Sequence, residues 1–313
     1  MFTPIRIGTR ESQLAVWQAT RVKELLETEG LAAVLVPIKS EGDIDLQTPL
    51  YEMGVQGVFT RSLDIALLNN TIDVAVHSMK DVPTQLPEGL QQAAVLERGP
   101  VHDLLVYKND LEFLNHRDSV AQIATSSIRR IAQWRHRFPQ HRLHNLRGNV
   151  NTRLRKLGEE PWDAAIFAQA GLERIHLRPE KSIVLDWMLP APAQGAILVV
   201  ARSEDERTLR SCGSLDDPDT ALCTKIERDF LRTLLGGCST PISALAQVED
   251  GDVYFSGQLL STDGGKKAEI EKILPIDRAD GIGRQAAEEL LEKGGRVIVE
   301  GIRAVETLAG KTS

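Results

Sequence analysis

Short apolar runs and longer helical stripes alternate along the N-terminal part of the chain. PIRIG, AVLVPI and IDVAV are apolar runs typical of buried strands, and a stripe of Ala15, Ala19, Val22 and Leu26 separates the first two. The stripe repeats every three or four residues, the period of an amphipathic helix, and Ser12 is placed to cap its first turn. FTRSLDIALLNN predicts a second helix. This strand–helix alternation indicates a mostly parallel sheet with helices on both faces.

The same alternation restarts after the segment RGPVHD at 98–103. LLVY, AQIA, LHNL and DAAIFA are predicted strands, with one helix over 126–138 and another after Gly148. A second break, PAPAQG at 190–195, precedes the apolar run AILVVA, which we expect to return to the first sheet. Two crossings between two α/β units predict a hinged pair of lobes with a cleft between them.

The pattern changes again from Asp217 onward. DTALCTKIERDFLRTLL and ADGIGRQAAEELLEKG read as helices, and VYFSGQLLS as a strand between them, which predicts a smaller α+β domain. We therefore expect a first lobe made of 1–98 and 195–213, a second lobe of 103–190, and a C-terminal domain of 217–313.

Composition and charge narrow the class of protein. The chain has 313 residues, 42% of them hydrophobic and 26% charged, as in globular proteins. No apolar run is long enough to cross a membrane, and the first residues contain no signal-peptide core, so we expect a cytoplasmic protein. The net charge of −7 argues against a nucleic-acid partner. No coiled-coil pattern suggests more than a monomer.

One segment departs from this acidic balance. Residues 119–158 contain no Asp or Glu, but they hold eight arginines and one lysine. A basic segment in an acidic protein predicts an anion-binding region.

Four predicted strand ends place cations beside hydroxyl groups, in GTRES, VHSMKDVPT, ATSSIRR and LRGNVNTR. In open α/β sheets, ligands bind beyond the carboxyl ends of the strands, and both helix N-termini and arginines suit carboxylates. The P-loop and dinucleotide fingerprints are absent from the sequence, so we favour an organic polycarboxylate over a nucleotide. The alternative is a set of ordinary helix caps and solvated ion pairs. The candidate residues are Arg10, Ser12, Ser78, Lys80, Asp81, Thr125, Ser126, Ser127, Arg129, Arg130, Arg147, Gly148, Asn149 and Arg153.

The three cysteines form no CxxC pair, which argues against a disulfide framework or a metal site. We expect Cys212 and Cys223 to be buried thiols. Cys238 differs, because two glycines in LLGGCSTP allow a close approach to it. The only histidine in a candidate active loop is His77, which we expect to be structural, so Cys238 lacks a base. A thiol of this kind is suited to carrying a covalently attached group.

Together these motifs resemble the porphobilinogen deaminase family. The resemblance rests on GTRES, WQA, HSMKDVP, TSSIRR, LRGNVNTRL, AGLERI and LLGGCSTPI, which cover nearly the whole chain in the family's order. It implies three domains, two of them similar to the lobes of periplasmic binding proteins. It also implies a dipyrromethane cofactor attached by a thioether to Cys238. Such a transferase joins four porphobilinogen units head to tail with loss of ammonia, giving hydroxymethylbilane for tetrapyrrole (haem) biosynthesis.

The resemblance also assigns roles to residues. Asp81 matches the catalytic aspartate, whose carboxylate would hold pyrrole N–H groups and stabilise a developing positive charge. The residues implied to bind the cofactor or substrate are Arg10, Ser12, Gln18, Ser78, Lys80, Thr125, Ser126, Ser127, Arg129, Arg130, Arg147, Gly148, Asn149, Arg153 and Arg174.

The chain departs from the family's pattern at three positions. Glu52 and Gln56 stand where the family often has lysine, and Ala193 stands where it often has glycine. Three alternatives therefore stay open: a two-lobed solute-binding or sensor protein for a polycarboxylate, a cysteine-dependent transferase without a cofactor, and a member with impaired elongation.

Overall fold

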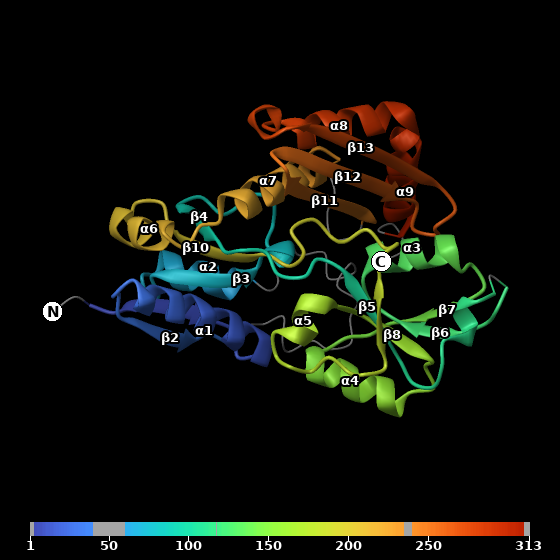
Figure 1. The fold of residues 1–313 in the computed structure, drawn as a ribbon, viewed down its shortest axis with the longest axis horizontal. Helices are drawn as coiled ribbons and strands as arrows, with labels where there is room; N and C mark the ends of the chain where they lie inside the picture. Colours follow the sequence, from blue (N-terminus) through green and yellow to red (C-terminus); the bar gives the residue numbers. More distant parts are fainter. Residues whose placement is uncertain (1–2, 40–59, 117, 235–239, 310–313) are drawn as a thin grey trace.

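The computed structural model describes residues 3–39, 60–116, 118–234 and 240–309. The predictions for Glu52, Gln56 and Cys238 lie outside these ranges and stay predictions. Three sheets form three parts of the molecule, with the C-terminal sheet lying above the two others in Figure 1. Among the helices that the structure describes, none has both the length and the apolar character needed to cross a membrane.

The first sheet has the strand order β2-β1-β3-β10-β4. Its strands are β1 (Ile5–Thr9), β2 (Ala33–Pro37), β3 (Val74–Ser78), β4 (Leu90–Val95) and β10 (Ile197–Arg202). Only β10 runs against its neighbours, β3 and β4, so the other strands share one direction. The mostly parallel sheet and the return of AILVVA to it are both confirmed.

Helices cover both faces of this sheet, as predicted. On one face, α1 (Gln13–Thr28) and α6 (Glu206–Gly213) bury apolar side chains against the strands, and on the other face α2 (Arg61–Leu68) does so. The buried stripe of α1 includes Ala19 and Leu26, as its periodicity predicts.

The second sheet repeats this plan with the order β7-β6-β8-β5-β9. Its strands are β5 (Asp103–Tyr107), β6 (Gln122–Ala124), β7 (Arg142–His144), β8 (Ala164–Ala168) and β9 (Ser182–Leu185). Here β5 is the reversed strand. Each reversed strand therefore directly follows one of the two crossings between the lobes.

Helices also cover both faces of the second sheet. One face packs against α3 (Ile128–Arg137), and the other against α4 (Val150–Glu159) and α5 (Gln169–Glu173). The predicted strand LHNL is shorter than expected, because Leu146 binds a side chain instead of a neighbouring strand. Its N–H donates to the Ser126 hydroxyl at 2.8 Å, and its carbonyl oxygen lies 2.6 Å from the same hydroxyl.

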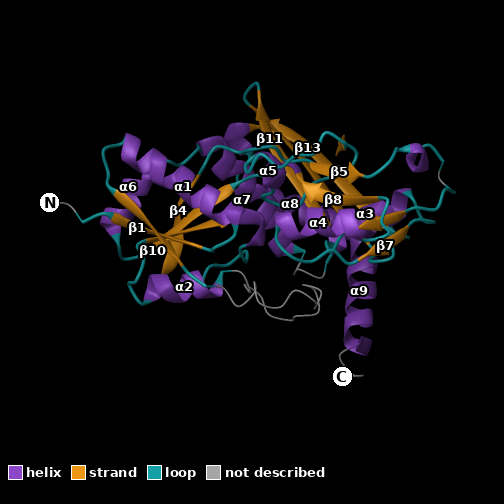
Figure 2. Cartoon of the chain, turned by 90° about the horizontal axis from the view of Figure 1, so that it is seen from below, coloured by secondary structure: helices purple, strands orange, loops and turns teal. Residues whose placement is uncertain are grey.

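The C-terminal part contains an antiparallel sheet, as the α+β prediction requires. The strands β11 (Ile242–Glu249), β12 (Asp252–Leu260) and β13 (Lys267–Pro275) follow one another in space. The main helices are α7 (Pro218–Thr233), α8 (Ile282–Leu290) and α9 (Arg296–Ala309), and α9 leads away from the body of the protein (Figure 2). Phe230 of α7 and Phe255 of β12 meet edge to face in the core of this domain.

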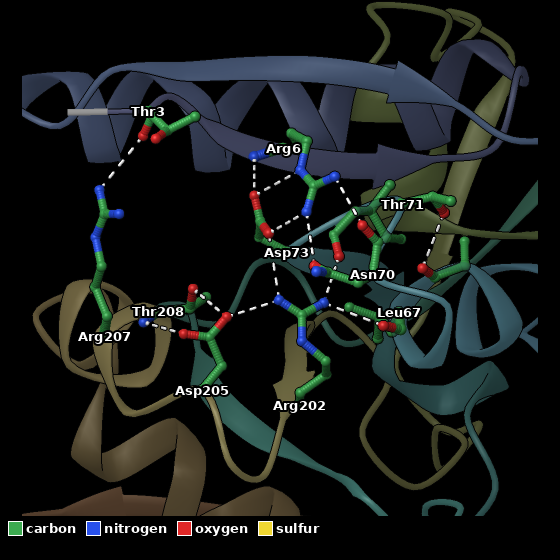
Figure 3. A network of polar contacts seen from close by, with 12 residues as sticks. Thr3, Arg6, Leu67, Asn70, Thr71, Asp73, Arg202, Asp205, Arg207 and Thr208 are labelled. Carbon is green, nitrogen blue, oxygen red and sulfur yellow. Dashed lines mark hydrogen bonds and ion pairs between the residues drawn. The ribbon is translucent and has the colours of Figure 1, made fainter. Parts of the chain in front are cut away.

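A network of ion pairs fixes the amino ends of the first lobe's parallel strands (Figure 3). Arg6 and Asp73 pair at 2.7 Å, and Arg202 at the end of β10 reaches Asp205 at 2.7 Å and Asp73 at 3.3 Å. Burial acts to raise the pKa of Asp73, but hydrogen bonds and charge from the two arginines outweigh it and hold that pKa below its usual value. The opposite, carboxyl ends of these strands are thus left for a site.

The close packing of α8 on α7 gives a test of this fold. A Cβ atom at Gly283 would lie 2.0 Å from the Ile226 carbonyl oxygen, whereas one at Gly158 in α4 would have no neighbour within 4 Å. We expect Gly283→Ala to lower the free energy of unfolding by about 1–3 kcal/mol through overpacking. The matched Gly158→Ala should be neutral or stabilising by up to about 1 kcal/mol. Urea unfolding followed by circular dichroism measures both, and equal effects would contradict this packing.

Candidate active site

The turn that follows β3 carries the predicted catalytic loop. Ser78 ends the strand, and Met79–Asp81 forms a single 3₁₀ turn on which Asp81 is exposed to solvent. Gln18 of α1 donates to the Ser78 hydroxyl at 2.9 Å, which ties this strand end to the helix. The carboxylate of Asp81 is therefore presented outward from a braced strand end.

Lys80 links this turn to the second lobe. Its ammonium group donates to Gln194 Oε1 at 3.3 Å. Burial lowers the pKa of Lys80 to about 8, an effect that Asp81 and Asp103 oppose and that two arginines of the second lobe strengthen. The arginines are Arg130 and Arg129. Side chains from both lobes therefore share one electrostatic cluster, as predicted from the strand ends.

The adjacent arginines of α3 are paired within the protein. Arg129 Nη2 lies 2.8 Å from Asp103 Oδ2, and Arg130 Nη2 lies 2.7 Å from Asp103 Oδ1. Further N–H groups donate to the carbonyl oxygens of Leu189 and Ile166, each at 2.9 Å. All three charged side chains are buried. The sequence indicated ligand carboxylates for these arginines, but one carboxylate of the protein already holds both.

Asp103 and Gln194 were missed by the sequence reasoning. The Gln194 amide nitrogen donates to Asp103 Oδ1 at 2.9 Å and to the Val101 carbonyl oxygen at 2.7 Å, while its oxygen accepts from Lys80. One signal was available in the sequence, because Asp103 and Gln194 are polar residues at the two predicted breaks. Their pairing joins the two crossings.

A buried ion pair anchors the same crossings to the C-terminal domain. Arg98 Nη1 and Nη2 bind the two oxygens of Glu227 in α7 at 2.7 and 2.9 Å. Glu227 also accepts from the N–H of Ala193 at 2.6 Å. Ala193 has a φ of 60°, in the left-handed region that favours glycine, so this departure from the family's pattern falls on a strained residue.

The predicted hydroxyl groups near α3 are used to shape its start. Ser127 is the N-cap of the helix and accepts from the N–H of Arg130 at 3.5 Å. Thr125 accepts from the N–H of Ser127 at 3.4 Å, and Ser126 holds Leu146 as described above. These residues build the turn, and the structure gives their hydroxyls local partners.

The start of α4 is built in a similar way. Asn149 is the N-cap and accepts from the N–H of Thr152 at 2.9 Å. Gly148 has a φ of 112°, and a Cβ there would lie 2.7 Å from Thr152, so glycine is required. The carbonyl oxygen of Gly148 accepts from Arg153 Nε at 2.7 Å, which fixes the arginine beside the turn.

Arg153 joins the two sides of the cluster. Burial lowers its pKa to about 10, and the charges of Arg130 and Arg147 act in the same direction, while Asp81 opposes them. Arg147 itself is buried. The Asp81 carboxylate thus interacts with Lys80 of its own lobe and with Arg153 of the other.

The remaining predicted residues lie around this cluster. Ser12 caps α1 by accepting from the N–H of Ala15 at 3.4 Å. Burial, followed by the charge of Arg10, lowers the pKa of His77 to about 4, so this buried imidazole is neutral near pH 7. Arg174 donates to the Gly195 carbonyl oxygen at 2.6 Å, which places it at the second crossing.

The described cysteines are buried thiols, as predicted. Burial raises the pKa of both Cys212 and Cys223 to about 12, which removes them as nucleophiles at neutral pH. Within the described parts of the chain, no group of histidine, cysteine and carboxylate side chains could hold a metal ion.

The shared carboxylate of Asp103 gives a pH-dependent prediction. Burial acts to raise its pKa, but Arg129 and Arg130 outweigh burial and hold the pKa well below its usual range. The stability it contributes is therefore present above pH ~4, the pKa of the unfolded chain, and is lost as the pH falls below that value. At pH 7 we expect Asp103→Asn to cost about 3–5 kcal/mol of unfolding free energy, and the difference from wild type to shrink in acid.

The exposed pair of Glu206 and Arg210 supplies the control. Glu206→Gln should change the unfolding free energy by less than about 0.5 kcal/mol at either pH. Urea titrations at a series of pH values measure both variants. A cost for Asp103→Asn that is small, or constant down to strong acid, would contradict the pairing.

Solved structures with a similar backbone are distant in sequence. The periplasmic VFT2 domain of Bordetella pertussis BvgS is 12% identical with a TM-score of 0.41, over 67% of this chain and 86% of that one. The methionine binding protein MetQ is 15% identical with a TM-score of 0.42, over 67% and 89%.

Sequence relatives are much closer. The porphobilinogen deaminase of Syntrophotalea carbinolica is 43% identical over 93% of both chains, and that of Pelobacter propionicus is 39% identical over 95% of this chain and 96% of its own. Residues 5–210 match the family described as "Porphobilinogen deaminase, dipyromethane cofactor binding domain", and residues 221–292 match "Porphobilinogen deaminase, C-terminal domain". The chain belongs to the porphobilinogen deaminase family.

Proposed function

We propose that this chain joins four porphobilinogen units head to tail, with loss of one ammonia per unit, and releases hydroxymethylbilane. The observation that carries the proposal is the exposed Asp81 carboxylate, which interacts with Lys80 from its own lobe and Arg153 from the other. Family membership and the names of the relatives support the same activity. The chain is thereby a transferase of tetrapyrrole biosynthesis.

The donor set fits a dipyrromethane cofactor. Its two pyrrole rings carry several carboxylates, and guanidinium groups bind carboxylates well. Among the described side chains, Arg129 Nε and Arg130 Nε are buried without a hydrogen-bond partner, so these arginines keep donor capacity beyond their pairing with Asp103. When bound, the cofactor supplies the free pyrrole carbon to which the first substrate unit is joined. Its attachment to Cys238 is part of the proposal.

The carboxylates of the substrate and cofactor would be held by the basic cluster and its neighbours. Each added pyrrole brings one acetate and one propionate, so the demand for cations grows with the chain. We assign this binding to Arg10, Ser12, Gln18, Ser78, Lys80, Thr125, Ser126, Ser127, Arg129, Arg130, Arg147, Gly148, Asn149, Arg153 and Arg174.

Lys80 can respond to such a ligand. Its pKa of about 8 means that burial and the nearby arginines already disfavour its charge. An added carboxylate would favour the charged form and raise this pKa again. The same reasoning applies to Arg153, whose pKa is also lowered by burial.

Asp81 would act on the positive charge that develops in the substrate. The C–N bond of the aminomethyl group breaks, ammonia leaves with the electron pair, and the remaining pyrrole-stabilised carbocation attacks the free pyrrole carbon. A C–C bond forms and that carbon loses its proton. A fixed carboxylate beside the pyrrole N–H groups stabilises this cation and costs no reorganisation during the reaction.

Three coarser assignments complete the proposal. We take 1–98 with 195–213, 103–190 and 217–313 as the three domains, and the protein as a cytoplasmic monomer. A two-lobed solute-binding protein is the alternative, but it accounts less well for residues 221–292, which match the C-terminal domain of the enzyme family.

Asp81→Asn tests the role of the carboxylate. Asparagine keeps one acceptor oxygen but removes the negative charge, so we expect kcat to fall by at least about 100-fold with the fold unchanged. Porphobilinogen consumption and ammonia release measure turnover, and circular dichroism checks the fold. Asp118→Asn, at another exposed position, is the control and should retain wild-type turnover. Normal turnover of Asp81→Asn would remove Asp81 from the mechanism.

A further inference from the structure

We infer that Arg228 of α7 is a positioning residue for Asp81, which ties the catalytic turn to the C-terminal domain. The inference rests on the proposed function, because it takes Asp81 as the group whose position matters. Arg228 belongs to none of the motifs that support the resemblance, and no part of the proposed mechanism uses it.

The guanidinium group of Arg228 binds the backbone on both sides of Asp81. Its Nη1 lies 2.9 Å from the Val82 carbonyl oxygen and 3.4 Å from that of Met79, and its Nη2 lies 2.5 Å from that of Pro83. One side chain therefore spans the 3₁₀ turn and the two residues that follow it. Asp81 lies between the carbonyl groups that are held.

The charge of Arg228 is directed to carbonyl groups rather than to a carboxylate. Among the described residues, no ion pair joins it to an acidic side chain, although Asp229 follows it in sequence and favours its charge. Burial lowers its pKa to about 10, and Arg232 lowers it further. A half-buried cation bonded to three carbonyl oxygens of one turn is suited to holding the backbone of that turn.

The position of Arg228 on α7 couples two anchors. The preceding residue, Glu227, holds Arg98 and the N–H of Ala193 at the crossings, so consecutive residues grip the hinge segments and the catalytic turn. The helix itself packs in the core of the C-terminal domain through Phe230. The turn that carries Asp81 is thus referenced to the C-terminal domain as well as to its own sheet.

Substitution of Arg228 in the full-length holoenzyme tests the inference. We expect Arg228→Gln to lower kcat at least about tenfold with KM within about twofold, because a displacement of about 1 Å can cost 100-fold in rate. Arg228→Lys, which keeps a donor and the charge, should recover part of the loss. Arg232→Gln is the matched control, since Arg232 lies one turn along the helix and pairs with Asp229, and it should leave kcat unchanged.

Two further measurements separate positioning from a general loss of structure. Intact mass should show the same cofactor content in Arg228→Gln as in wild type, and hydrogen exchange should rise in residues 79–83 and not in β11–β13. In the double variant with Asp81→Asn, turnover should equal that of Asp81→Asn alone, because Arg228 acts through Asp81.

Several results would overturn the inference. These are an unchanged kcat in Arg228→Gln, an equal loss in Arg232→Gln, or fully additive losses in the double variant. Failure of the proposed function would be seen separately, as normal turnover in Asp81→Asn or as a wild-type mass without the cofactor.

Discussion

The arrangement of the site depends on the carboxylate of Asp103, which is shared by two buried arginines. Burying one unpaired charge costs several kcal/mol, so Arg129 and Arg130 could not remain inside the protein without this partner. Gln194 extends the pairing to Lys80, which belongs to the other lobe. A single anion thereby permits a concentration of cations that would otherwise repel one another.

The same residues explain why the two crossings matter to function. Asp103 begins the reversed strand β5, and Gln194 lies shortly before the reversed strand β10. Each crossing therefore delivers a polar side chain to the point where the lobes meet. The Arg98–Glu227 pair fixes both crossings to α7, so the C-terminal domain is joined to the hinge rather than to one lobe alone.

Much of this could be predicted from the sequence, because strand ends and helix caps are local features. The periodicity located β1, α1 and β3, and the hydroxyl groups beside them marked the strand ends that meet at the site. Asp103, Gln194 and Arg228 could not be found in this way, since their partners lie far away in the sequence. The shortened strand β7 has a similar cause, because the Ser126 side chain that binds Leu146 comes from the preceding strand end.

The intact mass of the purified protein, compared with Cys238→Ser, tests the central claim most directly. The account predicts an excess mass equal to two linked pyrrole units in the wild type and no excess in the variant. An unmodified wild-type mass, from cells well supplied with porphobilinogen, would contradict the covalent cofactor and the polymerising mechanism that rests on it.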